Sequence, residues 1–319
     1  MNKYMKQDAK PSRTFKNLSS SFCSFVTALL LGSGSLAYCA GTVQRQARLE
    51  IVFTDSQAAL FTADSTGKSP ILFASGQKLD QPFGICLGNN GQYLVSDTGC
   101  MAIIAVDPVT GIQQTVASGG ILSVPFGIAA ERAGTVLVAN GQQIVRVDPQ
   151  SGSQSVAATG GFLRVPIAVA VADNGNIFVA DIMGSVVRIN SRTGQQTLLT
   201  SGGFLKCPQG IAVHGNDVFV TDVATADGNF GVGRVVHINA LSGLQTVVAE
   251  GNYLVGPVGI SIEKSGDLII ADPYTINPNS VDLFDGGIVR VNPSTGEQFL
   301  MARGKDNFVN PRCVAVVRD

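Results

Sequence analysis

A short segment that opens with proline recurs six times along this chain, and its spacing limits the possible folds more than any other feature. The clearest copies are residues 82–85 and 125–128, which both read Pro-Phe-Gly-Ile. The six opening prolines are Pro82, Pro125, Pro166, Pro208, Pro257 and Pro311, which follow one another at 43, 41, 42, 49 and 54 residues. A period of about 40 to 50 residues is typical of β-propeller blades built from four short strands each. The chain is therefore expected to be an all-β repeat protein.

Each repeat reads as four strands joined by turns. Strand one starts at the proline, where the missing N–H removes no bond from the sheet. Strand two is rich in β-branched residues and ends on a polar residue, which in the six repeats is Asp55, Asp97, Asn140, Asp181, Asp222 or Asp272. A turn such as residues 107–111, Asp-Pro-Val-Thr-Gly, links strands three and four. In it Asp opens the turn, Pro fixes φ and Gly takes the left-handed position.

The two ends of the chain predict how the ring closes. The last copy begins at Pro311 and leaves room for one strand before Asp319. Residues 51–55 read as a strand two that ends in Asp, and residues 60–64 read as a strand three with its turn. The N-terminal strands should therefore complete the C-terminal blade, giving a six-bladed β-propeller over residues 50–319. Closure would remove the exposed sheet edges that template aggregation.

The repeats also carry a family resemblance. The segment Gly-Ile-Ala-Val at residues 210–213 and the segment Phe-Val-Ala-Asp at residues 178–181 resemble the NHL-repeat family, and the likeness extends over residues 50–319. NHL propellers include lyases, ligand binders and protein- or RNA-binding modules, so the resemblance implies a fold and leaves the function open. Six-bladed rings of similar shape occur in the gluconolactonase-like and streptogramin lyase-like families.

Residues 1–40 have the layout of a secretory signal. Five basic residues between Lys3 and Lys16 precede an apolar run at residues 22–31, and small residues follow up to Ala37. This order is typical of a signal peptide, which predicts a periplasmic or extracellular protein with a short linker at residues 41–49. A membrane anchor is an alternative, although the run is shorter than the roughly 20 residues of a span. A lipid anchor at Cys39 is another, although Tyr38 stands where a small residue is normally needed.

Composition excludes some classes of partner. Charged residues make up 14% of the chain, the formal net charge is −1 and there is no Trp. Neither a basic field for nucleic acid nor an aromatic stacking surface is present. We expect a monomer without a membrane span in the mature domain. The cysteines after residue 40 are Cys86, Cys100, Cys207 and Cys313, which form no CxxC pair. Either a disulfide or buried thiols would fit them.

Propeller geometry places two polar residues at the mouth of the channel. We define the upper face as the face that carries the start of every strand one and the loops between strands two and three. The residues after the prolines should ring the channel there, and they are Phe83, Phe126, Ile167, Gln209, Val258 and Arg312. Arg312 and Gln209 break this apolar ring. Arg312 is a candidate for binding an anionic group, with pairing to a neighbouring Asp or exposure to solvent as the alternative.

A second set of candidates comes from the residues that end strand two. A carboxylate repeated in five of the six blades is expected to be structural, accepting hydrogen bonds from the turn that follows it. A calcium site is the alternative, because calcium takes several oxygen ligands. The distance from this residue to the next Asp or Asn turn is 8 to 10 residues in four repeats, but 17 after Asp222 and 20 after Asp272.

The two long loops should therefore form a wall on the upper face, which is where repeat proteins often bind. The candidate ligand-binding residues are Arg312, Gln209, Asp222, Asp272, Tyr274, Asp282 and Asp285. Among these, Asp272, Asp282 and Asp285 could hold calcium, the one cofactor that the sequence suggests. A solvated loop without a ligand is the other interpretation.

Residue types needed by several enzymes are missing from the expected upper face. His214 should lie in a lower-face turn and His237 on an outer strand, while Glu131 and Glu263 also fall in lower-face turns. Zinc chemistry and a Ser-His-Asp triad are therefore not supported. Two hypotheses remain. The favoured one is a scaffold that binds a protein or small molecule through the upper face. The other is a metal-assisted hydrolase or lyase, gluconolactonase-like, with an Asp-rich site at the channel mouth.

Overall fold

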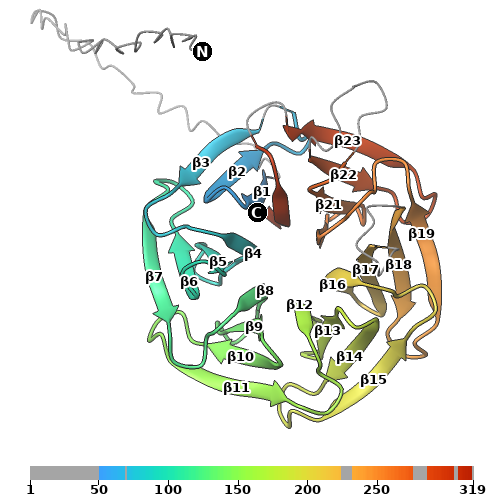
Figure 1. Ribbon diagram of the computed structural model, residues 1–319, viewed down its shortest axis with the longest axis horizontal. Coiled ribbons are helices and arrows are strands. Elements are labelled where there is room, and N and C mark those ends of the chain that lie inside the picture. The colour runs from blue at the N-terminus through green and yellow to red at the C-terminus, as the bar shows by residue number, and fades with distance from the viewer. Residues whose placement is uncertain (1–49, 69, 224–231, 276–285, 305–307, 318–319) are drawn as a thin grey trace, which may run out of the picture. The chain divides into compact units, whose positions relative to one another are not determined.

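The fold is a ring of six four-stranded antiparallel sheets arranged around a central axis (Figure 1). The computed structural model describes residues 50–68, 70–223, 232–275, 286–304 and 308–317. The prediction of an all-β, six-bladed propeller is confirmed. Within the described ranges no helix is long and apolar enough to cross a membrane.

Each blade runs from an inner strand at the channel to an outer strand at the rim. The first three blades consist of β4 (Pro82–Leu87), β5 (Tyr93–Asp97), β6 (Ala102–Val106) and β7 (Gln113–Ser118); β8 (Pro125–Ala130), β9 (Val136–Asn140), β10 (Gln143–Val147) and β11 (Gln154–Thr159); and β12 (Pro166–Val171), β13 (Ile177–Asp181), β14 (Ser185–Ile189) and β15 (Gln196–Ser201).

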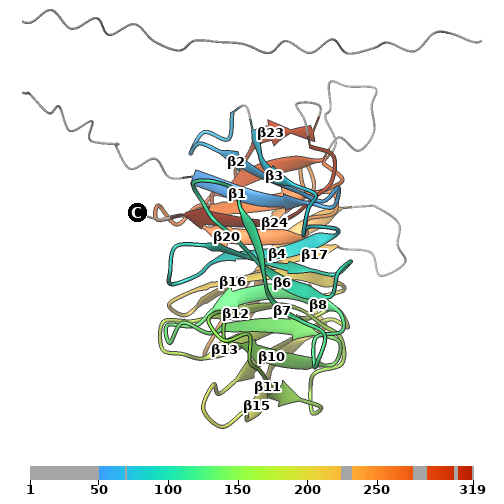
Figure 2. The same cartoon turned by 90° about the vertical axis from the view of Figure 1, so that its left-hand side faces the viewer.

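The fourth and fifth blades follow the same order. They consist of β16 (Pro208–His214), β17 (Asp217–Val223), β18 (Gly233–Asn239) and β19 (Gln245–Glu250); and β20 (Gly259–Ile262), β21 (Leu268–Asp272), β22 (Gly287–Val291) and β23 (Gln298–Arg303). The sixth blade contains both ends of the described chain, with β24 (Pro311–Val317) innermost, then β1 (Glu50–Asp55), β2 (Ala59–Ala63) and β3 (Ile71–Ser75). Seen from its edge, the ring has strands that run between two loop-bearing faces (Figure 2).

The hydrophobic core is divided among the six contacts between neighbouring blades. Because side chains alternate along a strand, the middle strands bury both faces. In β17, Val218 and Val220 pack toward the third blade and Phe219 packs toward the fifth. This explains why strand two reads as a continuous apolar run in the sequence.

Close packing of the inner strands requires small residues at their third position. A Cβ placed on Gly210 would lie only 2.1 Å from the carbonyl oxygen of Val258 in the next blade. The inner strand is also irregular at this point, since its register with β17 shifts between Pro208 and Gly210. A bulge of this kind redirects side chains.

The composite sixth blade confirms the predicted closure. Ile51 and Phe53 of β1 face Val316 and Val314 of β24 in an antiparallel pair. Phe53 also packs edge to face against Phe308, with ring centroids 4.9 Å apart. The pairing of β1 with β24 is therefore the only strand pairing between the two described ends of the chain. The predicted signal at residues 1–40 and linker at residues 41–49 lie outside the described residues.

Candidate binding site

The six residues that end strand two are buried and hold the blade connectors in place. Asp181 is typical, because its Oδ2 accepts the N–H groups of Arg164 and Val165 at 2.7 and 2.8 Å. Its Oδ1 accepts the N–H of Met183 at 3.0 Å from the loop that follows. The full set is Asp55, Asp97, Asn140, Asp181, Asp222 and Asp272, all completely or almost completely buried. The structure thus gives each one a partner in the connector that enters its blade.

Asn140 shows that the contact with the connector is the shared element. Its Oδ1 accepts the N–H groups of Ser123 and Val124 at 2.9 and 3.0 Å, as an Asp would. Its Nδ2 donates to the carbonyl oxygen of Ile121, which a carboxylate could not do. An amide therefore replaces the acid without loss of the connector bonds.

Asp272 and Tyr274, two of the predicted ligand-binding residues, belong to one such arrangement. Asp272 accepts N–H groups from Val255 and Gly256 on the connector and from Tyr274 on its own loop. The ring of Tyr274 lies against Gly256, where an added Cβ would come within 2.5 Å of it. Burial raises the pKa of Asp272 to about 6, although these N–H bonds lower it. Tyr274 therefore covers the connector that Asp272 holds.

Asp222 has the same place in the fourth blade. Its Oδ2 accepts the N–H groups of Lys206 and Cys207 at 2.8 and 2.9 Å. Burial raises the pKa of Asp222 to about 6, opposed by those two bonds and by the charge of Arg234. Asp222 thus makes the same connector bonds as its counterparts, while its buried Oδ1 has no hydrogen-bond partner among the described residues.

The predicted calcium ligands are only partly described. Asp282 and Asp285 lie outside the described residues, and Asp272 uses both oxygens for backbone N–H groups. Among the described residues no group of three or more His, Cys, Asp and Glu side chains could hold a metal ion. The calcium site and the metal-assisted hydrolase stay hypotheses.

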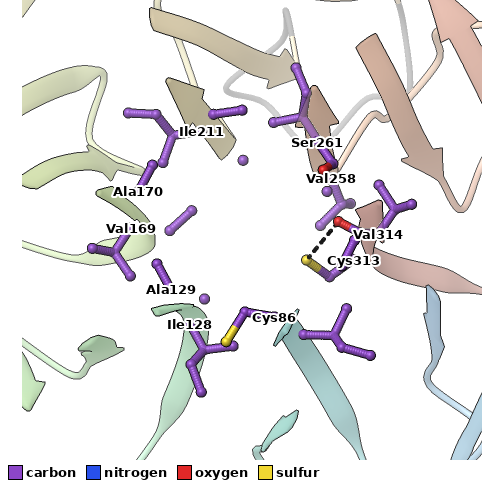
Figure 3. Close-up of a pocket in the computed structure, with 18 of the residues that line it drawn as sticks. Cys86, Ile128, Ala129, Val169, Ala170, Ile211, Val258, Ser261, Cys313 and Val314 are labelled. Carbon is purple, nitrogen blue, oxygen red and sulfur yellow. Dashed lines mark hydrogen bonds between the residues drawn. The ribbon is translucent and has the colours of Figure 1, made fainter. Parts of the chain in front are cut away.

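The structure places the other two predicted residues, Arg312 and Gln209, on the wall of one cavity. The inner strands enclose a channel of about 290 Å³, and both residues line it together with Phe83 and Val258. Below them the wall is formed by small and aliphatic residues from all six blades (Figure 3). Arg312 and Gln209 are half-buried there. The sequence-based placement of these two residues at the channel agrees with the structure.

Both histidines lie where the sequence analysis expects them. His214 is exposed at the lower end of β16. The Nε2 of His237 on β18 lies 2.7 Å from Oδ1 of Asp217. On the corresponding strands β10 and β22, Arg146 pairs with Glu131 and Arg290 pairs with Glu263. None of these residues lines the channel.

All four cysteines of the propeller are free thiols with raised pKa values. Cys86 and Cys313 line the channel, where burial first and the neighbouring Cys313 second raise the pKa of Cys86. Cys100 is exposed on the upper face, yet burial of the thiol and the nearby Asp97 raise its pKa to about 12. An exposed thiol that stays protonated is a poor nucleophile.

The pKa of Cys100 leads to a prediction about its reactivity. At pH 8 we expect Cys100 to react with iodoacetamide at least about tenfold more slowly than a cysteine in a short peptide, since little thiolate forms. Peptide mapping by mass spectrometry over a time course would measure the rate. The same reaction in urea should proceed at the peptide rate, because unfolding separates the thiol from Asp97. Equal rates with and without urea would contradict the proposed environment.

Two features of the upper face were missed at the sequence level. One is a set of hydroxyl bridges between blades, in which Thr221 Oγ1 accepts from Gly210 N–H and donates to Val258 O. Thr54 and Ser96 bridge their blades in the same way. Their sequence signal is a hydroxyl residue directly before the buried Asp. In the other three blades Ala precedes Asn140, Asp181 and Asp272.

The other missed feature is an apolar patch around the third blade. Phe162, Val165, Met183 and Phe204 are 37% to 59% exposed. Their loops are neighbours, because Ile182 N–H donates to Val165 O and Gly184 O accepts from Gly202 N–H. The signal was present in the connectors at residues 160–163 and 202–205, which both read Gly-Gly-Phe-Leu. In each of them the Leu is buried and the Phe before it is exposed.

Comparison with known proteins supports the fold without assigning a family. The sequence matches no protein-family model and no curated protein. Among solved structures it is similar to a chain in the crystal structure of a nidogen/laminin complex, with a TM-score of 0.68 at 13% identity. The match covers 84% of this chain and 98% of the other. A likeness at this identity shows the shared architecture alone.

Proposed function

We propose that this chain is an exported, monomeric propeller of the NHL type that binds a protein partner through its upper face. The observation that carries the proposal is the patch of Phe162, Val165, Met183 and Phe204. Aromatic residues and Met are enriched in protein interfaces, and neighbouring exposed apolar groups mark interaction sites. The nidogen/laminin relative, a propeller solved within a protein complex, is consistent with this use of the fold.

Two basic side chains beside the patch indicate the chemistry of the partner surface. Arg164 lies between Phe162 and Val165, and Lys206 follows Phe204 by two residues. Both are exposed, and their N–H groups are held by Asp181 and Asp222 respectively. The buried carboxylates therefore fix the backbone from which the basic side chains extend. A partner surface with apolar residues flanked by carboxylates would complement this patch.

The matched test uses apolar residues on opposite faces. The double variant Phe162→Ser, Phe204→Ser should weaken capture of the partner from the organism's exported fraction by about tenfold or more, because buried aromatic residues dominate interfaces. The control is Val109→Ser, Leu241→Ser, which alters residues 82% and 72% exposed on the lower face. Quantitative mass spectrometry of captured proteins measures the change. A partner that binds the upper-face variant normally, or is lost only with the lower-face control, would overturn the proposal.

A further inference from the structure

The central channel is built asymmetrically, with an apolar side and a polar side. The second and third blades contribute only apolar groups to its wall, such as Ala129 and Ala170 (Figure 3). The fourth, fifth and sixth blades contribute Gln209, Ser261 and Arg312. A volume of about 290 Å³ is close to the lower limit of small-molecule sites, so its occupant would be small.

The apolar side continues up to the mouth of the channel. Phe83 and Phe126 meet there edge to face, with ring centroids 5.3 Å apart. Ile167 follows in the next blade and is almost completely buried. Each of the three is the second residue of its inner strand, as Arg312 is. Phe83 lines the channel, and it packs together with Phe126 against the core cluster that contains Ile167, which holds its ring in place.

Arg312 is the residue that the architecture does not explain. Four of the five other blades place an apolar residue at this position. Within the described part of the chain no carboxylate pairs with Arg312, whereas the five ion pairs found there all lie elsewhere. A half-buried guanidinium has lost part of its hydration, so an anion bound beside it would be favoured. Its planar fork suits a carboxylate.

Gln209 adds a second polar contact on the same side. Its Nε2 donates to the carbonyl oxygen and to the sulfur of Cys207, at 3.3 and 3.2 Å. These contacts fix the orientation of the amide, and Oε1 is then the atom left to accept a donor group. Gln209 and Arg312 belong to the fourth and sixth blades, with Val258 of the fifth blade between them.

We infer that the channel binds a small carboxylate with an apolar body. The carboxylate contacts Arg312 at the mouth, and the apolar body lies against Phe83 and the aliphatic wall. This site is separate from the protein-binding patch on the third blade. Failure of either proposal leaves the other standing, because they depend on different residues and different ligands.

The test compares three probes on the full chain by isothermal titration calorimetry. Hexanoate carries both the charge and the apolar body, acetate carries the charge alone, and 1-hexanol carries the apolar body alone. We expect hexanoate to bind at millimolar concentrations and the other two to bind at least about tenfold more weakly, since each loses one half of the contact. No measurable binding of hexanoate, or equal binding of hexanoate and acetate, would overturn the inference.

Substitutions at Arg312 then test whether this residue binds the carboxylate. Arg312→Gln should weaken hexanoate binding by about tenfold or more, and Arg312→Lys, which keeps the charge without the fork, should bind with intermediate affinity. The matched control is Arg164→Gln, an exposed upper-face arginine that does not line the channel. Thermal unfolding of each variant without ligand checks the fold. Unchanged affinity in both Arg312 variants, or equal loss in the Arg164 control, would show that the anion binds elsewhere.

Discussion

A chain that ends at Asn310 is expected to lose the folded propeller. The truncation removes β24, the innermost strand of the sixth blade, and with it every partner of β1 on the channel side. Val314 is buried in the contact with Ile51, Phe53 and Phe308. Buried apolar side chains contribute about 1.5 to 3 kcal/mol each, so the loss of this strand should cost about 5 kcal/mol or more. That is comparable to the whole stability of many domains.

The truncation would also break the hydrogen-bond bridge across the closure. Cys313 N–H donates to Thr54 Oγ1 at 3.0 Å, and Thr54 Oγ1 donates to the carbonyl oxygen of Phe83 at 2.8 Å. This bridge joins the sixth blade to the first. Without β24, β1 becomes an exposed edge strand, which promotes association between chains. Aggregation should therefore accompany the loss of stability.

Urea unfolding followed by circular dichroism would measure the effect, with size-exclusion chromatography to detect association. The control is a chain that ends at Val317, which keeps all of β24. A peptide of residues 311–317 added to the truncated chain should restore part of the stability by occupying the vacated position. If the chains ending at Asn310 and Val317 unfold at the same urea concentration, closure by β24 does not stabilise the ring.

The strands and the closure could be predicted because each depends on a local pattern that recurs. Proline at the start of strand one, an apolar run in strand two and an Asp turn after strand three appear in copy after copy. Repetition separates these signals from chance. The composite blade followed from the same comparison, since an isolated strand one at the end of the chain needs the strands found at its beginning.

The candidate site was harder to predict because it depends on departures from the pattern. Arg312 and Gln209 stood out since their neighbours in the ring are apolar. The hydroxyl bridges were missed because the position of Thr54, Ser96 and Thr221 is Ala in the other three blades, which is typical of ordinary small-residue packing. The patch of Phe162 and Phe204 was missed because an apolar residue in a connector gives no sign of whether it faces the core. The Phe side chain faces solvent because the Leu that follows it occupies the buried position of the connector.

The buried Asp residues were expected to accept bonds from the loop that follows, and the structure adds the connector that precedes. In Asp181, two of the three bonds come from Arg164 and Val165, which are 17 and 16 residues earlier in the chain. No local motif shows a contact at that separation. It arises because the connector enters the blade beside the end of strand two.

Asp181→Ala is accordingly expected to destabilise the propeller by about 2 to 4 kcal/mol. The substitution leaves three backbone N–H groups without their acceptor, and hydrogen bonds to a charged group contribute about 1.5 to 3 kcal/mol each before water replaces some of them. The residue is completely buried, so no new side-chain contact compensates. Thermal and urea unfolding of the variant against the wild type would measure the loss.

Asp181→Asn is the informative companion. Asn140 shows that an amide oxygen can accept both connector N–H groups. In the variant that contact survives, but the amide nitrogen replaces the oxygen that accepts Met183 N–H, so we expect a loss of about 1 kcal/mol. The predicted order of stability is therefore wild type, then Asn, then Ala.

The same two variants separate a structural role from a metal role for these carboxylates. If Asp181 acts through backbone N–H groups alone, both losses should be the same in EDTA and in millimolar calcium, because no ion contributes to the stability of the wild type. If it were a calcium ligand, calcium would raise the melting temperature of the wild type and of neither variant, by mass action on the folded state. Asn and Ala would then be equally deficient in the calcium response. A graded loss that calcium does not alter would identify the buried acids as the bonds that fix each connector, and through them the upper face from which a partner would be bound.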